Sequence, residues 1–127
     1  MNNHNLQSWT KKLGKAWTNR DAKAAAYLFA KNCKYYESAL ENPCNNWSDI
    51  LKLWQTVPQN QKNVVFKFKI LAISDKFGIV NWDVKRTLLP SNEKQVIDGI
   101  FQISLDKNGL CIFFKQWRKS KILKYKN

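Results

Sequence analysis

The sequence predicts an α+β fold in which N-terminal helices pack on one face of a strongly curved antiparallel sheet. Three observations support this prediction. Apolar residues recur at helical spacing near the N-terminus, the hydrophobic period changes to two from Asn63, and four strand-like segments then follow one another. The 127 residues suit a single domain, 1–127, because a chain of this length buries roughly two thirds of the surface that its unfolded state exposes.

Two helices are expected before the first strand. The first carries apolar residues at three- and four-residue spacing along one stripe, namely Leu6, Trp9, Leu13, Ala16 and Trp17. Asp21 suits the start of the second helix, because its side chain can accept a hydrogen bond from an unpaired backbone N–H group. We expect that helix to continue through AKAAAYLFAK to about Asn32, since these residues favour helices.

A short strand and a third helix should follow. The segment CKYYESA alternates as a strand does, and ENPCNN is typical of a loop. Ser48 is expected to cap a helix in SDILKLWQTV, which Pro58 would end. In that helix Ile50, Trp54 and Val57 share one face.

The C-terminal half predicts a four-stranded meander. In NVVFKFKILAIS one face carries Val64, Phe66, Phe68 and Ile70. In IVNWDVKRTLL one face carries Val80, Trp82, Val84 and Arg86. The segments QVIDGIFQISL and LCIFFKQW supply the last two strands.

The last two strands form a predicted hairpin with a type I turn at DKNG, closed by Gly109 in the left-handed region. Pairing Asp106 with Leu110 would place Gly99 opposite Trp117. One face would then carry Asp98, Ile100, Gln102, Phe114, Gln116 and Arg118. The other would carry Gly99, Phe101, Ile103, Phe113, Lys115 and Trp117. Neither face is polar enough to be a solvated face, so we expect the first to meet the helices around a cavity and the second to form a homodimer.

The order of these elements resembles the SnoaL-like proteins of the nuclear transport factor 2-like (NTF2-like) superfamily. The resemblance covers nearly the whole chain and is carried by the following: Trp17, Asp21, Leu28-Phe29, Tyr35-Tyr36-Glu37, Ile50 to Trp54 and DGIFQISLDKNGLCIFFKQW. It implies a cone-shaped domain with a deep apolar pocket for a small apolar or aromatic ligand, and dimers formed through the sheet.

Proteins of this fold include cofactor-free isomerases, cyclases, dehydratases and epoxide hydrolases, and others that only bind, so fold does not decide activity. The epoxide-hydrolase arrangement needs an Arg between two Asp residues. Aligned with it, this chain has Trp82, Val84 and Gln116, so that chemistry is not expected. The only histidine, His4, lies near the chain end and is not expected to act.

Glu37 is the best candidate for a catalytic acid or base, because an apolar aromatic wall would raise the pKa of its carboxyl group. Asp98 is the second candidate. The alternatives are an ion pair of Glu37 with a lysine at the rim, and a cross-strand pair of Asp98 with Arg118. The predicted ligand-binding residues are Trp17, Tyr35, Trp47, Trp54, Phe66, Phe68, Trp82, Ile100, Phe114 and Gln116. For any one aromatic among them, ordinary core packing is the competing interpretation.

The chain is strongly basic, with 22 Lys+Arg against 9 Asp+Glu and a net charge of +13. A surface for nucleic acid or an acidic partner is therefore the alternative to small-molecule binding, although a solvated basic face is favoured. Cys33, Cys44 and Cys111 form no C-x-x-C pair, so no metal site is expected. No cofactor motif and no apolar run long enough for a membrane is present, and the N-terminus lacks the pattern of a secretory signal. We therefore expect a cytoplasmic protein.

Overall fold

The helices and strands follow the predicted α+β order. A computed structural model describes residues 1–56 and 58–123. Its elements are α1 (Asn3–Thr18), α2 (Ala22–Ala26), β1 (Phe29–Tyr36), α3 (Trp47–Thr56), a 3-10 turn (Pro58–Asn60), β2 (Gln61–Ile73), β3 (Gly78–Leu88), β4 (Lys94–Leu105) and β5 (Cys111–Ile122).

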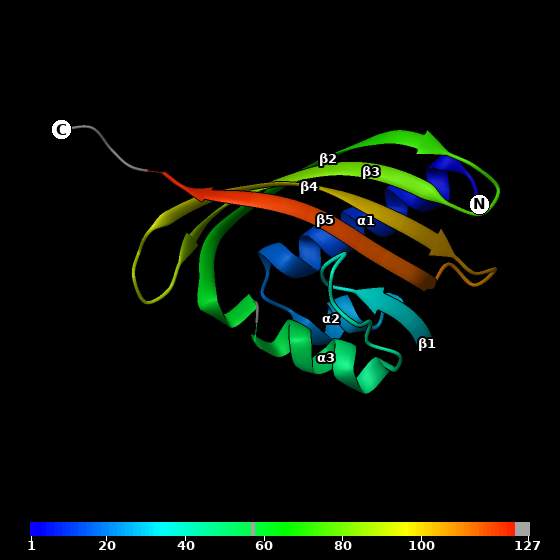
Figure 1. Ribbon diagram of the computed structural model, residues 1–127, viewed down its shortest axis with the longest axis horizontal. Coiled ribbons are helices and arrows are strands. Elements are labelled where there is room, and N and C mark those ends of the chain that lie inside the picture. Colours follow the sequence, from blue (N-terminus) through cyan, green and yellow to red (C-terminus); the bar gives the residue numbers. More distant parts are fainter. Residues whose placement is uncertain (57, 124–127) are drawn as a thin grey trace.

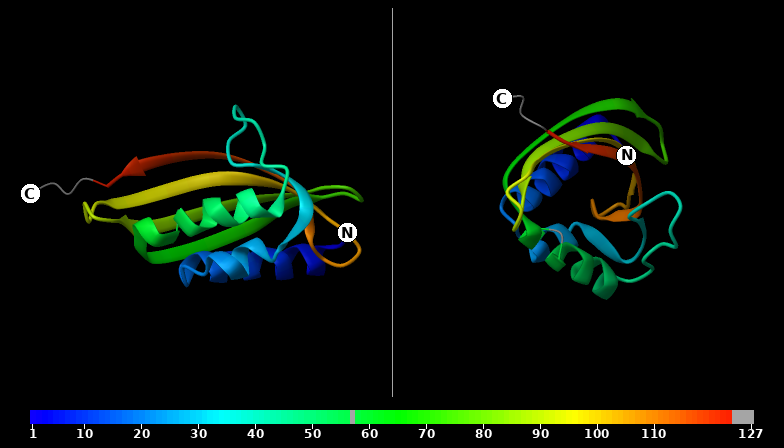
Figure 2. Two further views of the ribbon diagram at one scale, coloured as in Figure 1. Left: turned by 90° about the horizontal axis from the view of Figure 1, so that it is seen from below. Right: turned by 60° about the vertical axis from the view of Figure 1, so that its left-hand side comes forward.

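The five strands form one sheet in the order β1-β5-β4-β3-β2. Strands β2 to β5 make the predicted antiparallel meander, and β1 joins β5 in parallel at the edge. The sheet curves around α1, while α2 and α3 close the open side of the cone (Figure 1). Seen along the cone, no helix covers the outer face of the sheet (Figure 2).

The two N-terminal helices are capped by side chains. The Asn2 side chain accepts a hydrogen bond from the Asn5 N–H group, and Asp21 caps α2 as predicted, accepting from the Ala24 N–H at 3.0 Å. The predicted end of the second helix is wrong, because α2 stops at Ala26. From Phe29 the chain pairs with β5 instead, so strand pairing overrides the helix propensity of these residues.

The cap of helix α3 lies two residues before the predicted one. Asn46, not Ser48, accepts the hydrogen bond from the Asp49 N–H group at 2.9 Å. Ile50 and Trp54 are buried on one face as predicted, whereas Val57 lies outside the described residues. Helix α3 thus buries two residues, whereas α1 buries seven, so α3 is held by fewer core contacts than α1.

The inner faces of β2 and β3 are those that the alternation predicts. Val80, Trp82 and Val84 are fully buried, Val64 is buried, and Phe66 packs against the same core from β2. The aromatic and aliphatic core therefore fills the space between the sheet and α1.

The register of the last hairpin was only partly predicted. Gly109 has the expected positive φ of 81°, and the Asp106 N–H donates to the Leu110 carbonyl at 2.8 Å. Leu105 pairs with Cys111 but Ser104 pairs with Phe113, so Ile112 forms a β-bulge.

Beyond the bulge every pair is shifted by one residue. Gly99 faces Arg118 and Ile100 faces Trp117. The predicted faces of β5 are confirmed, with Phe114 on the inner face and Trp117 on the outer face, but the predicted faces of β4 are wrong. Phe101 is buried in the core, and Ile100 lies on the outer face of the sheet.

None of the helices in the described part of the chain is long and apolar enough to cross a membrane.

Candidate functional site

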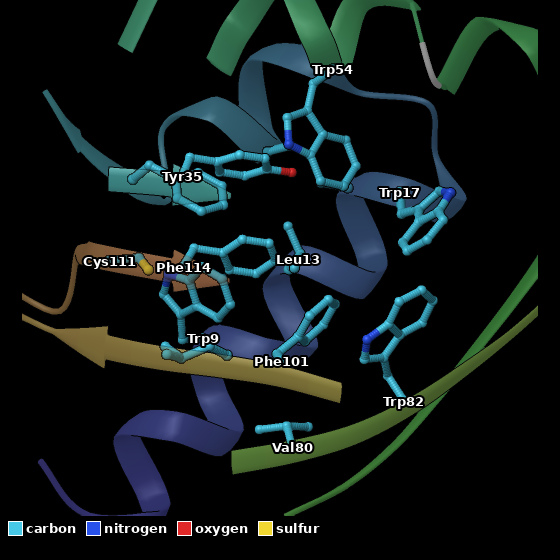
Figure 3. Packing of buried hydrophobic residues seen from close by; sticks show 14 of the residues in the cluster. Trp9, Leu13, Trp17, Tyr35, Trp54, Val80, Trp82, Phe101, Cys111 and Phe114 are labelled. Carbon is cyan, nitrogen blue, oxygen red and sulfur yellow. The ribbon is translucent and has the colours of Figure 1, made fainter. Parts of the chain in front are cut away.

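A pocket lies between α3 and the inner faces of β1, β4 and β5. Aromatic side chains from α1, β1, α3, β4 and β5 converge on it (Figure 3). Its lining residues are Trp17, Tyr35, Glu37, Leu53, Trp54, Phe101, Phe114, Gln116 and Arg118. One end is therefore apolar, and the other carries the polar groups.

The apolar walls are held by ring contacts. Tyr35 stacks on Phe114 with ring centroids 4.7 Å apart, because β1 and β5 pair at these two residues. Trp17 of α1 meets Trp54 of α3 edge to face at 5.8 Å. Such contacts keep aromatic walls in fixed orientations.

The polar end is built around the carboxyl group of Glu37, which directly follows β1. The Tyr35 hydroxyl donates to Glu37 Oε2 at 3.1 Å, and Arg118 Nη1 lies 3.2 Å from Oε1. The Gln116 amide donates to the backbone carbonyl of Glu37 at 2.8 Å, which ties the residue to β5. Within the described ranges, Glu37 and Arg118 form the only ion pair.

Burial raises the pKa of Glu37, while the Arg118 charge and the Tyr35 hydrogen bond act in the opposite direction. Its side chain is only 17% exposed. Burial also raises the pKa of Tyr35 well above its usual value, so its hydroxyl stays protonated and donates at neutral pH. The result is a carboxyl group of raised pKa at the end of an aromatic pocket.

The pocket is narrow as it stands. Its free volume is about 10 Å³, which is room for about one water molecule. In the described structure the buried indole N–H of Trp17 has no hydrogen-bond partner. That of Trp54 interacts with the Tyr35 hydroxyl but does not reach hydrogen-bond geometry. A ligand larger than water must therefore displace one of the lining elements. Once bound, it could accept hydrogen bonds from these two indole N–H groups.

The structure brings together several of the predicted residues. Glu37 and the predicted wall residues Trp17, Tyr35, Trp54, Phe114 and Gln116 line the pocket. Trp82 lies one layer behind it, stacked on Phe101 at 4.9 Å.

Three other predicted wall residues lie elsewhere. The Trp47 indole N–H donates to the Ala26 carbonyl at 2.7 Å, so its ring covers α2. Phe66 packs behind Trp17, with Phe68 beyond it along β2. Their placement in the wall is corrected, because α3 and β5 rather than β2 border the pocket.

Ile100 and Asp98 are separated from the pocket by the register shift. Both lie on the outer face of the sheet, and Asp98 accepts a hydrogen bond from the Asn81 side chain at 3.2 Å. Asp98 faces Lys119, not Arg118. It therefore cannot act together with Glu37.

Sequence reasoning missed Leu53, Phe101 and Arg118. Arg118 was placed on the correct face but assigned to Asp98, and Phe101 was lost because the bulge was not foreseen. Leu53 lies three residues after Ile50, and this helical spacing could have identified it.

The comparisons with known proteins agree with this architecture. No protein-family model and no curated protein matches the sequence. Among solved structures, SalBIII, an epoxide hydrolase/cyclase-like enzyme of pyran ring formation in the polyether salinomycin, matches with a TM-score of 0.80 at 11% identity. The match covers 92% of this chain and 95% of SalBIII.

Two further structures match over similar lengths. The hexachlorocyclohexane dehydrochlorinase LinA has a TM-score of 0.75 at 11% identity, covering 94% of this chain and 86% of its own. The Δ5-3-ketosteroid isomerase from Mycobacterium sp. has a TM-score of 0.75 at 9% identity, and the match covers 92% of this chain and 98% of the isomerase. Identities this low show the fold alone. The chain has the cone-shaped α+β fold of the NTF2-like superfamily, as the resemblance predicted.

Proposed function

We propose that this protein binds a small, largely apolar molecule between α3 and the inner face of the sheet, and that Glu37 moves a proton on it. The supporting observation is the position of the Glu37 carboxyl group. It lies at the polar end of an aromatic pocket, between the Tyr35 hydroxyl and the Arg118 guanidinium.

This arrangement suits proton removal from a carbon next to a carbonyl group. The Glu37 carboxylate would take the proton, leaving an enolate, and would return it to another carbon of the same molecule. Arg118 would stabilise the enolate oxygen, since its side chain is 40% exposed at the pocket mouth and can turn toward a ligand. Among the structural neighbours, ketosteroid isomerisation and dehydrochlorination are also reactions that remove a proton from carbon.

Ligand entry requires α3 to move outward. The present free volume of about 10 Å³ is far below the few hundred Å³ that drug-sized ligands usually occupy. Leu53 and Trp54 form the α3 side of the pocket, and α3 buries few side chains. Displacing this helix would open the pocket without breaking the sheet.

The ketone 2-tetralone, a bicyclic aromatic compound, tests the proposal. NMR in deuterated water follows the loss of its α-protons, and in a separate titration in ordinary water the indole N–H signals of Trp17 and Trp54 report binding. We expect wild-type protein to shift both signals and to accelerate exchange. Glu37→Gln should bind but not accelerate, while the exposed Glu93→Gln is the matched control and should behave as wild type.

Two outcomes would limit or overturn the proposal. Exchange that is equally fast in Glu37→Gln would remove the catalytic role and leave the alternative of binding without catalysis. Unshifted indole signals at high ketone concentration would overturn the pocket itself. The homodimer through the outer sheet face and the cytoplasmic location stay predictions.

A further inference from the structure

The outer face of the sheet gathers much of the positive charge of the chain. Its outward-pointing lysines come from β1, β2, β3 and β5, namely Lys34, Lys67, Lys69, Lys85, Lys115, Lys119 and Lys121. The outward carboxylates are Asp83 and Asp98, which face each other across β3 and β4. No helix covers this face (Figure 2).

Most of these lysines have no acidic neighbour across the strands. Lys67 lies opposite Asp83, and Lys119 lies opposite Asp98, so the charges of these four neighbouring residues cancel. The rest face neutral residues; for example, Lys69 faces Asn81. Within the described ranges, none of the seven lysines named above forms an ion pair. The face therefore presents uncompensated cations over most of its width.

An aromatic stripe runs through this basic face. The Trp117 ring is 42% exposed, and the Lys115 ammonium lies 5.1 Å from both the Trp117 and the Tyr36 ring centroids. Tyr36 contacts Phe113 at 5.7 Å, and Phe113 contacts Phe77 at 5.6 Å. Flat aromatic surfaces thus lie directly beside positive charges.

We infer that the outer face of this sheet binds single-stranded nucleic acid, with bases stacked on the stripe from Trp117 to Phe77 and phosphates on the flanking lysines. Proteins that bind single strands without strong sequence preference combine aromatic side chains, on which bases stack, with positive charges that contact the phosphates. The homodimer predicted from the sequence would occupy this same face, but a second copy of the chain fits less well, because a twofold interface would place unpaired lysines against lysines. An acidic protein would match the charge but would leave the exposed indole unused.

Fluorescence anisotropy with a labelled oligothymidylate of about 12 nucleotides tests this inference. Binding through about five phosphates should give a slope of roughly −3.5 in the logarithm of affinity against the logarithm of salt concentration. An equally charged polyglutamate peptide is the competitor, and it should displace the oligonucleotide poorly because it offers no bases.

Matched variants locate the site. Trp117→Ala should weaken binding about fivefold or more, the loss expected for one stacked base. The double variant Lys85→Glu with Lys121→Glu should weaken it at least about tenfold. Lys11→Glu with Lys15→Glu, on the exposed side of α1, changes the net charge equally and should have little effect. The four substituted lysines carry exposed side chains, so circular dichroism should confirm unchanged folding.

Three results would overturn the inference. The first is equal weakening by the two double variants, which would mean attraction by net charge alone. The second is displacement by polyglutamate as effective as by unlabelled oligonucleotide, which would indicate an acidic protein. The third is a dimer in sedimentation that Trp117→Ala dissociates and the oligonucleotide does not. None of these results depends on the pocket, so the proposed small-molecule function can fail or stand separately.

Discussion

Gly99→Ala tests how tightly the sheet packs behind the pocket. An added Cβ at residue 99 would lie 2.6 Å from two ring carbons of Trp82 and 2.7 Å from the backbone carbonyl oxygen of Trp117. Ordinary contacts to a Cβ are 3.4–4 Å, so at least one neighbour must move. The predicted register placed Gly99 opposite Trp117, but the ring for which Gly99 makes room is that of Trp82, on the inner face.

Neither neighbour can move cheaply. Trp82 is fully buried and is stacked on Phe101 at 4.9 Å, and the Trp117 oxygen belongs to the β5 backbone. Overpacking of this kind costs about 1–3 kcal/mol. Replacing glycine also restricts the unfolded chain, which offsets about 0.4–1 kcal/mol. We expect a net loss of about 1–2 kcal/mol, or a fall in Tm of roughly 5 °C for a chain of this size.

Urea unfolding followed by circular dichroism measures the change. The variant Trp82→Phe supplies a smaller ring, so the double variant should recover part of the loss, with a coupling energy of at least about 0.5 kcal/mol. A Gly99→Ala protein as stable as wild type, or additive effects of the two substitutions, would refute this account of the packing. It would also mean that Trp82 does not hold the Phe101 ring rigidly in the pocket lining.

Three further predictions concern the pocket. Arg118→Gln removes the charge that lowers the Glu37 pKa, which then rises further above its usual value of 4.5. The folded state then binds more protons than the unfolded chain, so stability is kept below pH 4.5 and lost as the pH rises through the new pKa. Urea unfolding below pH 4.5 and at neutral pH checks this sign. Tyr35→Phe keeps the ring stack but removes the hydrogen bond to Glu37; carbon-13 NMR titration should show a higher Glu37 pKa, and an unchanged value would contradict the 3.1 Å bond. Phe101→Ala should cost about 3–5 kcal/mol and enlarge the pocket, so that 2-tetralone raises its Tm more than that of wild type.

The fold could be predicted because hydrophobic period and turn chemistry are local properties. The change of period at Asn63, the cap at Asp21 and the left-handed Gly109 all identify structure from a few neighbouring residues. The end of α2 could not be predicted in this way. The segment after Ala26 favours a helix locally, and only pairing of Phe29 with Cys111, far along the chain, makes it a strand.

The kind of site could be predicted from the sequence, but not all of the residues that form it. Tyr35 and Glu37 could be assigned from one strand, because alternation places residues 35 and 37 on the same face. Arg118 could not be joined to Glu37, since these residues meet only when β1 lies parallel beside β5. Trp47 shows the opposite error, because a tryptophan on the helix that borders a pocket can still turn its ring to a neighbouring helix.

The bulge at Ile112 decides the chemistry of both faces of the sheet. Without it, the turn that pairs Asp106 with Leu110 would set Ile100 beside Phe114 on the inner face and send Phe101 outward. The bulge shifts β5 by one residue against β4, so that Gln116 and Arg118 point inward opposite Phe101 and Gly99. Trp117 lies outside in either register, between Lys115 and Lys119, because successive side chains of a strand alternate. The inserted residue therefore decides which β4 side chains meet the pocket and which join the outer face, and a register change in this hairpin would exchange Phe101 for Ile100 opposite Gln116.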